Sequence, residues 1–268
     1  IIKELEKMIE TRNLNYSYEE KKVLKNINIS LKKGKLTCLL GANGSGKTTF
    51  IKTLNGIINK DSGKIYIDDK SLDQLKQKEI AKKISMVPQE HNSVFSYKSL
   101  DVVIMGVTPY LGFGKQPDKN TYYKAKKIMD KLNILEMADR NYNELSGGER
   151  QLVLIARALL QDTEYMLFDE PTSHLDFKNQ HLILRELKKL TKKQKGVVTA
   201  LHDPNFALKY SDQVIILKDG KILTSGKTEM VMNSHNLSEA YETEIIVNEL
   251  NKKIENESEN DAEIKEVI

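Results

Sequence analysis

The chain has 268 residues, of which 39% are hydrophobic and 30% are charged, and its mean hydropathy is -0.49. This balance is typical of a globular domain, and no stretch approaches the ~18 consecutive apolar residues of a membrane-spanning helix. The net charge of +4 comes mostly from scattered lysines and only 6% of the residues are aromatic, which argues against a nucleic-acid-binding surface.

The first part of the chain predicts strands and does not show the pattern of a signal peptide. Its N-terminal residues are charged throughout and lack the apolar core of such a segment, so we expect a cytoplasmic protein. Residues 11–35 alternate around turns and predict antiparallel strands, whereas 36–41 form an apolar run that predicts a strand buried on both faces. That run contains the single cysteine, Cys38, which we expect in the core. Further strands are predicted within 61–72 and 81–90.

The pattern then becomes helical and later alternates between strand and helix. Helices are predicted at 99–106, 121–138 and 147–161. Three later apolar runs, at 164–170, 196–202 and 211–220, predict strands of a parallel sheet wrapped by helices, and residues after Gly226 are expected to be helical. The predicted boundaries are one domain over 1–250, with a core of 1–88 and 162–250 and a helical subdomain of 89–161, and an exposed acidic tail over 251–268.

A phosphate-binding loop follows the predicted strand at 36–41. Residues 41–48 read GANGSGKT and match G-x-x-x-x-G-K-[ST] between a strand and a helix. Glycines suit this place because backbone N–H groups must converge on a polyphosphate, and the helix adds its positive end. Lys47 is expected to reach the β- and γ-phosphates, and Thr48 to offer a hydroxyl to Mg²⁺. The predicted ATP-binding residues here are Gly41, Asn43, Gly44, Ser45, Gly46, Lys47, Thr48 and Thr49.

Polar side chains end three of the predicted strands. Asp169 and Glu170 close one run, so both emerge at the edge where ligands bind in parallel sheets, although such a pair alone could also open a helix. Asp169 is expected to hold Mg²⁺, and Glu170 to orient and deprotonate the attacking water. His202 could contact the γ-phosphate or the water, and Gln89 the Mg²⁺–water cluster. We predict Glu170, His202 and Gln89 as catalytic residues, and Thr48, Gln89 and Asp169 as Mg²⁺ ligands.

A further motif indicates the family. The segment LSGGERQ at 145–151 resembles, residue for residue, the signature of ATP-binding cassette (ABC) ATPases. With the phosphate loop, Gln89, FDEP, SHLD and His202, it makes the chain similar to that family from about 11 to about 227. The resemblance implies an α/β P-loop NTPase fold with a RecA-like parallel-sheet core, an N-terminal antiparallel β subdomain and an inserted helical subdomain.

The resemblance also implies a dimer. In that family two subunits pair head to tail, and the signature of one contacts the ATP held by the other. Here Ser146, Gly147 and Gly148 would make that contact, ahead of a helix expected to begin near Glu149. Asp176 would contact the other subunit's phosphate loop. A homodimer with two composite ATP sites is therefore expected.

Other residues resemble one branch of the family. The comparison suggests that Tyr18 stacks on adenine, with Tyr16 as the alternative. Many ABC ATPases have alanine at the position of His174. This histidine and the segments SLDVVIMGVTPYLGF and HDPNFAL resemble the ATPases of importers for iron–siderophore chelates, haem, cobalamin and sometimes molybdate. The region after Gln89 is expected to form a groove for a cytoplasmic helix of a membrane permease, or else simply to pack within the helical subdomain.

These features lead to one functional expectation and two alternatives. We expect an ATP-hydrolysing subunit on the inner face of the cell membrane, which works with Mg²⁺, a permease and, indirectly, an extracytoplasmic substrate-binding protein. A soluble ABC-type ATPase is the first alternative, but the repair and translation types usually carry coiled-coil insertions or tandem cassettes. A binding-only nucleotide switch is the second, and it would be expected to lack Glu170 or His202.

Overall fold

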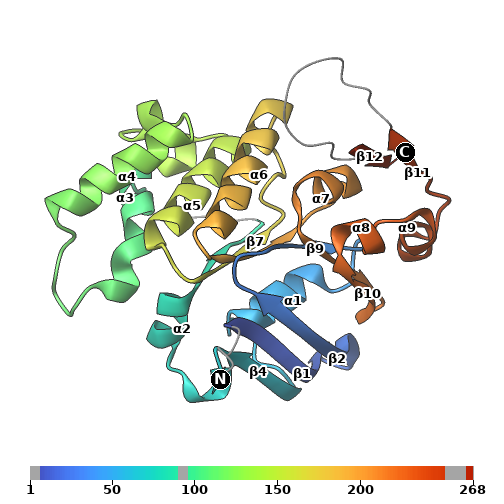
Figure 1. Cartoon of the computed structure of the whole chain (residues 1–268). Helices are drawn as coiled ribbons and strands as arrows, with labels where there is room; N and C mark the ends of the chain where they lie inside the picture. Colours follow the sequence, from blue (N-terminus) through green and yellow to red (C-terminus); the bar gives the residue numbers. More distant parts are fainter. Residues whose placement is uncertain (1–6, 90–95, 251–263, 268) are drawn as a thin grey trace, which may run out of the picture.

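The computed structural model describes residues 7–89, 96–250 and 264–267, and within them a six-stranded sheet forms the centre of the fold (Figure 1). Its strand order is β10-β9-β3-β8-β7-β6. The neighbours β9, β3, β8, β7 and β6 are parallel, and β10 joins the edge antiparallel to β9. The strands are β3 (Leu36–Leu40), β6 (Ile84–Val87), β7 (Tyr165–Asp169), β8 (Gly196–Ala200), β9 (Gln213–Lys218) and β10 (Lys221–Lys227).

The central strands are buried on both faces, as their continuous apolar runs predict. Every residue of β3, β7 and β8 is buried. Side chains of β7 alternate between faces: Met166 and Phe168 pack towards the inserted helices, whereas Tyr165 and Leu167 pack with the antiparallel sheet. Since these strands are parallel, their carboxyl ends meet at one edge, which is where Asp169 ends β7.

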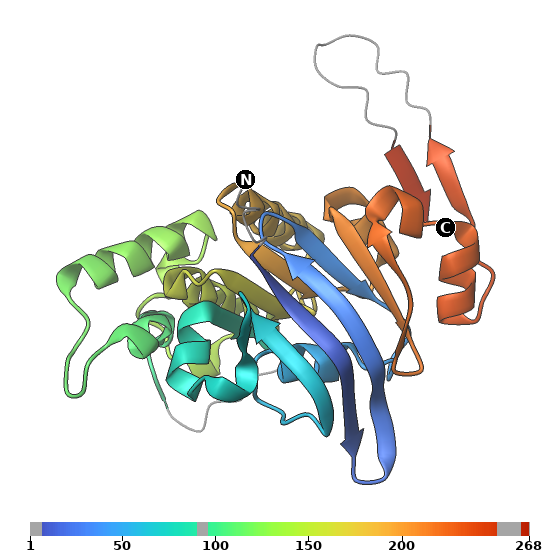
Figure 2. The same cartoon turned by 60° about the horizontal axis from the view of Figure 1, so that its bottom comes forward.

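An antiparallel sheet with the order β2-β1-β4-β5 packs beside the central sheet, and Figure 2 shows its long β1–β2 ribbon. Its inner face shares a core with α1 (Lys47–Leu54), where Leu24 and Ile65 join Phe50. Gly63 is required because a Cβ there would lie 2.2 Å from the Asn13 carbonyl oxygen. The strands are β1 (Met8–Tyr18), β2 (Lys21–Lys32), β4 (Ser62–Ile67) and β5 (Lys70–Ser71).

The helices between β6 and β7 form the predicted insert, coloured green to yellow in Figure 1. The helix predicted over 121–138 is shorter than expected and ends at Lys131. The chain leaves it through Asn133, whose φ of 57° lies in the left-handed region, and continues as a short 3-10 turn. Before and within this region lie η1 (Leu72–Gln74), α2 (Gln77–Lys83), α3 (Ser99–Ile104), η2 (Met105–Tyr110), α4 (Lys119–Lys131), η3 (Leu135–Met137), η4 (Tyr142–Glu144) and α5 (Gly147–Gln161).

The C-terminal part adds helices to the central sheet. Cys38 is buried in the core that these helices share with β3 and β9, as predicted. Strand β10 is not among the predicted elements, because the preceding apolar run ends at Gly220 and no element is predicted at 221–226. All of its residues are partly or fully exposed, so the strand lacks the apolar signal of the buried ones. The helices are α6 (Phe177–Lys192), α7 (Pro204–Tyr210), α8 (Thr228–Val231) and α9 (Ser234–Tyr241).

The end of the chain differs in part from the exposed tail that we expected. Residues 251–263 and 268 of that predicted tail lie outside the described residues. The rest forms β12 (Ile264–Val267), which pairs antiparallel with β11 (Val247–Leu250). Within the described ranges no helix combines the length and apolar character needed to cross a bilayer. The predicted fold class, with a parallel-sheet core, an antiparallel sheet and inserted helices, is confirmed.

Candidate active site

The phosphate-binding loop turns tightly between β3 and α1. Gly41, Gly44 and Gly46 have φ values of 140°, 79° and 108°, which side chains rarely adopt. A Cβ at Gly41 would lie 2.1 Å from the Leu217 carbonyl oxygen, so the loop passes directly against the end of β9. The Tyr241 hydroxyl of α9 also accepts a hydrogen bond from the Gly41 N–H at 3.4 Å. The backbone is thus held in the shape that turns N–H groups towards a bound anion.

Lys47 is folded back over this loop. Its ammonium donates hydrogen bonds to the carbonyl oxygens of Gly41 and Ala42, at 2.7 and 3.1 Å. Burial lowers the pKa of Lys47, and the nearby charges of Glu170 and Asp169 act in the opposite direction. A buried cation with only carbonyl partners is suited to exchange them for phosphate oxygens.

The end of β7 supplies a buried carboxylate that fits Mg²⁺. Asp169 is fully buried, its Oδ1 accepts a hydrogen bond from the Thr48 hydroxyl at 3.1 Å, and its Oδ2 has no hydrogen-bond partner. Burial is the main reason that the pKa of Asp169 is raised. An orphaned carboxylate oxygen beside a threonine hydroxyl is the oxygen donor set that Mg²⁺ prefers.

Glu170 is held by side chains from three neighbouring segments. Its Oε2 accepts a hydrogen bond from Gln89 Nε2 at 2.7 Å and from the Ser173 hydroxyl at 3.4 Å, and His202 Nε2 lies 2.6 Å away. Its φ is 52°, a strained value for a glutamate, and its side chain is buried. The structure therefore brings together the three residues that the sequence predicts as catalytic, with one carboxylate oxygen shared among them.

These groups face one cavity of about 890 Å³. Tyr18 lines it and is half exposed, whereas Tyr16 packs against the core beneath, with the two rings 4.9 Å apart. The predicted site residues that line the cavity are Tyr18, Asn43, Gly44, Gly46, Lys47, Thr48, Thr49, Gln89, Glu170 and His202. Three other predicted residues are near the cavity without lining it. Gly41 and Ser45 lie within the phosphate-binding loop, and Asp169 is buried beneath the cavity.

Several cavity residues were not predicted from the sequence. The β9–β10 turn reaches the loop because the Gly220 N–H donates to the Ser45 carbonyl at 3.2 Å, while the Gly220 carbonyl accepts from the Lys25 N–H at 2.7 Å. The unpredicted lining residues are Lys21, Lys22, Val23, Lys25, Asp219 and Gly220. No sequence pattern marks these residues, because lysines are frequent along the whole chain and these meet the loop only through strand pairing.

The signature residues lie outside this cavity. Ser146 caps α5: its hydroxyl accepts from the Glu149 N–H at 3.2 Å, and its own N–H donates to Glu149 Oε2 at 2.7 Å. This capping box starts the helix at Gly147, which matches the predicted helix at 147–161 and lies two residues before Glu149. A Cβ at Gly148 would lie 2.6 Å from the His174 carbonyl oxygen, so the signature packs closely on that segment.

Asp176 also lies outside the cavity, at the start of α6. It caps this helix by accepting a hydrogen bond from the Asn179 N–H at 2.7 Å. None of the predicted trans-acting residues, Ser146, Gly147, Gly148 and Asp176, lines the cavity within the described part of the chain. The structure thus places them on a second surface of the subunit.

A phosphate-binding loop, a buried carboxylate beside a threonine hydroxyl, and a second carboxylate held by glutamine and histidine together define a P-loop nucleotide hydrolase. The sequence profile of the ABC transporter family matches residues 24–173. The chain belongs to this family and is an ATP-binding cassette ATPase.

Curated relatives cover most of the chain. It is 38% identical over 238 residues to an iron chelatin transport ATP-binding protein of Helicobacter pylori, with 88% of this chain and 93% of that protein covered. It is 34% identical over 239 residues to the petrobactin import ATP-binding protein of Bacillus subtilis, with 89% and 94% covered.

Solved structures agree with these relatives. An inward-facing ABC transporter of the metal-chelate type has a TM-score of 0.81 and 30% identity, over 98% of this chain and 97% of that one. A dimeric bacterial ABC transporter cassette has a TM-score of 0.75 and 31% identity, over 82% of this chain and 99% of that one. The fold and the family therefore agree.

Glu170→Gln should lower ATP turnover by roughly 10²–10⁴-fold, the usual scale for loss of a positioned general base, and should leave ATP binding intact. Phosphate release and equilibrium binding of a fluorescent ATP analogue measure the two effects. Glu164→Gln is the matched control, because Glu164 precedes the opposite end of β7 and pairs with Lys33. Turnover near the wild-type rate in Glu170→Gln would contradict the assigned role.

Asp169→Asn should stabilise the nucleotide-free protein in EDTA by about 1 kcal/mol at neutral pH, because it removes a buried carboxylate with an unpaired oxygen. The raised pKa of Asp169 means that the folded state binds the proton more tightly than the unfolded state does. Wild-type stability therefore falls as the pH rises through the range in which Asp169 loses its proton. The stability gained in Asp169→Asn should therefore shrink as the pH is lowered. At neutral pH the variant should also lose Mg²⁺-dependent ATP turnover.

Urea unfolding at several pH values measures this effect. The exposed Asp139, whose pKa is lowered by its hydrogen bond to Lys98, provides the control Asp139→Asn. A loss of stability in Asp169→Asn at neutral pH would contradict this prediction. It would show that the buried charge of Asp169 is stabilised by more than its hydrogen bond to Thr48.

Proposed function

We propose that this ATPase powers import of a metal chelate, such as an iron–siderophore complex, haem or cobalamin, through a membrane permease. The carrying observation is the Glu170 carboxylate, held 2.7 Å from Gln89 Nε2 and 2.6 Å from His202 Nε2 in the cavity of the phosphate-binding loop. Support for the import role comes from the relatives named for iron chelatin transport and petrobactin import, and from the metal-chelate type transporter.

The predicted residues in and beneath the cavity have separate roles in this reaction. Lys47 binds the β- and γ-phosphates, and Tyr18 stacks on the adenine. Thr48 and Asp169 would hold Mg²⁺, with Gln89 beside them, and the bound ion would supply positive charge to the reaction. Glu170 orients the attacking water and accepts its proton, and His202 and Gln89 fix the direction of its carboxylate. The chemistry is mainly positioning and charge neutralisation of an in-line transfer.

The working form is a head-to-tail homodimer. The signature residues lie outside the subunit's own cavity, and their N–H groups at the start of α5 suit the γ-phosphate of a nucleotide on a second copy. The dimeric cassette supports this arrangement. Asp176 would contact the other copy's phosphate loop. ATP then closes the dimer because its charge bridges both copies, and hydrolysis removes the bridge.

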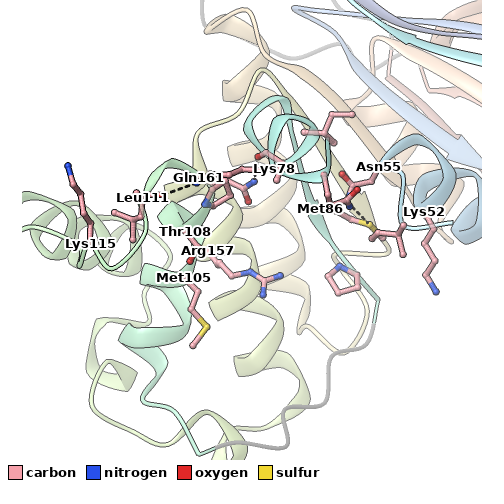
Figure 3. A pocket seen from close by; sticks show the side chains of 18 of the residues that line it. Lys52, Asn55, Lys78, Met86, Met105, Thr108, Leu111, Lys115, Arg157 and Gln161 are labelled. Carbon is pink, nitrogen blue, oxygen red and sulfur yellow. Dashed lines mark hydrogen bonds between the residues drawn. The ribbon is translucent and has the colours of Figure 1, made fainter. Parts of the chain in front are cut away.

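The membrane partner docks in a groove between the sheet core and the helical insert (Figure 3). The groove has a volume of about 840 Å³ and lies between α2, β6, η2 and α5. Hydrogen bonds cross it from Gln161 Nε2 to the Ala81 carbonyl at 2.6 Å and from Lys78 Nζ to the Leu111 carbonyl at 2.8 Å. The subunit is thus peripheral on the cytoplasmic face, and an extracytoplasmic binding protein delivers the chelate to the permease.

In cells whose own gene encodes Glu170→Gln, uptake of one labelled metal chelate should fall to the background level, because the permease loses its energy source. Uptake of labelled ferric siderophores, haem and cobalamin measures this, and Glu164→Gln cells provide the control. Unchanged uptake of all of them would contradict the import role, although the ATPase activity itself would stand.

Glu170→Gln with ATP should behave as a dimer, because the bound triphosphate persists between the two copies. Light scattering after size exclusion measures the mass with ATP and with ADP. Ser146→Arg added to Glu170→Gln should restore the monomer, since a bulky side chain would then occupy the contact with the nucleotide. A strictly monomeric Glu170→Gln protein at high concentration with ATP would refute the composite site.

A further inference from the structure

Arg157 extends from α5 into the docking groove. Figure 3 shows its side chain in the open part of the pocket, and none of the dashed hydrogen bonds involves it. Its side chain is half-buried. No carboxylate of the described residues accepts a hydrogen bond from it or forms an ion pair with it. Burial lowers the pKa of Arg157, with Tyr142 giving the only opposing contribution from the described residues. A partly desolvated guanidinium without a counter-charge is costly to keep.

The other cations of the groove are placed differently. Among the described lining residues the charged side chains are all basic. Lys78 donates to a carbonyl oxygen, Lys52 lies close enough to Asp169 to lower its pKa, and Lys115 is exposed to water. Lys52 is also partly buried but lies near Asp169, so Arg157 is the partly buried groove cation that has no carboxylate of the described residues beside it.

The remaining lining offers apolar contact. Ile57 and Met105 are exposed on the groove, Met86 lies on its floor, and Phe113 is fully exposed at its rim. Methionine side chains adapt to the shape of a partner, and exposed apolar groups beside a cation suit an amphipathic segment. The charge and the apolar lining together specify the chemistry of the occupant.

We infer that the groove takes a short cytoplasmic segment of the permease that is apolar on one side and places an aspartate or glutamate against Arg157. This rests on the proposed function, because it names the partner chemistry of the same docking site. Arginine is suited to this role because its planar fork can donate two parallel hydrogen bonds to one carboxylate. Such a pair fixes the register of the segment in the groove, which apolar contact alone does not.

The test uses the full-length tagged chain, purified in detergent with the integral membrane protein that accompanies it from its own cells. Arg157→Met should retain at least tenfold less of this permease at low salt, whereas Arg157→Lys should retain more than Arg157→Met. Lys115→Met, which removes an exposed cation of the same groove, should change retention less than twofold. The ATP turnover of the isolated subunits should be unchanged, which shows that the variants fold.

The reciprocal change identifies the partner group. Aspartates and glutamates in cytoplasmic loops of that permease are neutralised one at a time, and one variant should reproduce the loss without adding to Arg157→Met. Exchanging the two charges between the proteins should recover part of the retention. Equal retention by wild type and Arg157→Met would overturn the inference and leave the proposed function standing, whereas no permease with wild type would contradict the proposed function.

Two further outcomes would also overturn the inference. If Glu90→Gln, at a carboxylate outside the described residues, reproduces the loss, then the partner of Arg157 belongs to this chain. If no loop carboxylate of the permease matters but removal of anionic lipid from the detergent complex does, then the groove binds a lipid phosphate instead.

Discussion

At the end of β7, Asp169 and Glu170 place two neighbouring buried carboxylates at one edge of the sheet, and the fold must keep both there with little water around them. Glu170 is held by Gln89, Ser173 and His202, whereas one oxygen of Asp169 has no partner. Lys47 provides positive charge beside both, at the cost of its own burial. One carboxylate oxygen therefore lacks a partner, and in the proposed mechanism Mg²⁺ is the cation that would pair with it.

The parallel topology explains how these charges meet. The phosphate loop follows β3, Gln89 follows β6 after one proline, and His202 follows β8 after one leucine, so the loops gather at one sheet edge. The β9–β10 turn links the antiparallel sheet to that edge, because Gly220 forms hydrogen bonds both with β2 and with the phosphate-binding loop. The helical insert carries the signature on another surface, and the groove lies where insert and core meet.

Much of this arrangement could be predicted from the sequence. Continuous apolar runs marked β3, β7 and β8, and GANGSGKT, FDEP and LSGGERQ each stand at an element boundary that fixes their place. Features without a local pattern could not be predicted. The lysines of the cavity, the exposed strand β10 and the charge of Arg157 in the groove depend on contacts between distant segments. The early end of α4 depends on one left-handed residue, Asn133, in an otherwise helical run.

The close approach of Gly148 to the His174 carbonyl has a consequence for signalling between the two nucleotides of a dimer. His174 follows directly on Ser173, which bonds to Glu170 of the same subunit, whereas Gly148 belongs to the turn that would face the other subunit's nucleotide. Because a Cβ at Gly148 would lie 2.6 Å from that carbonyl oxygen, a shift of one segment would have to displace the other. In the proposed dimer, release of phosphate at one interface would then alter the position of Glu170 at the other, so the two hydrolysis reactions would not be independent.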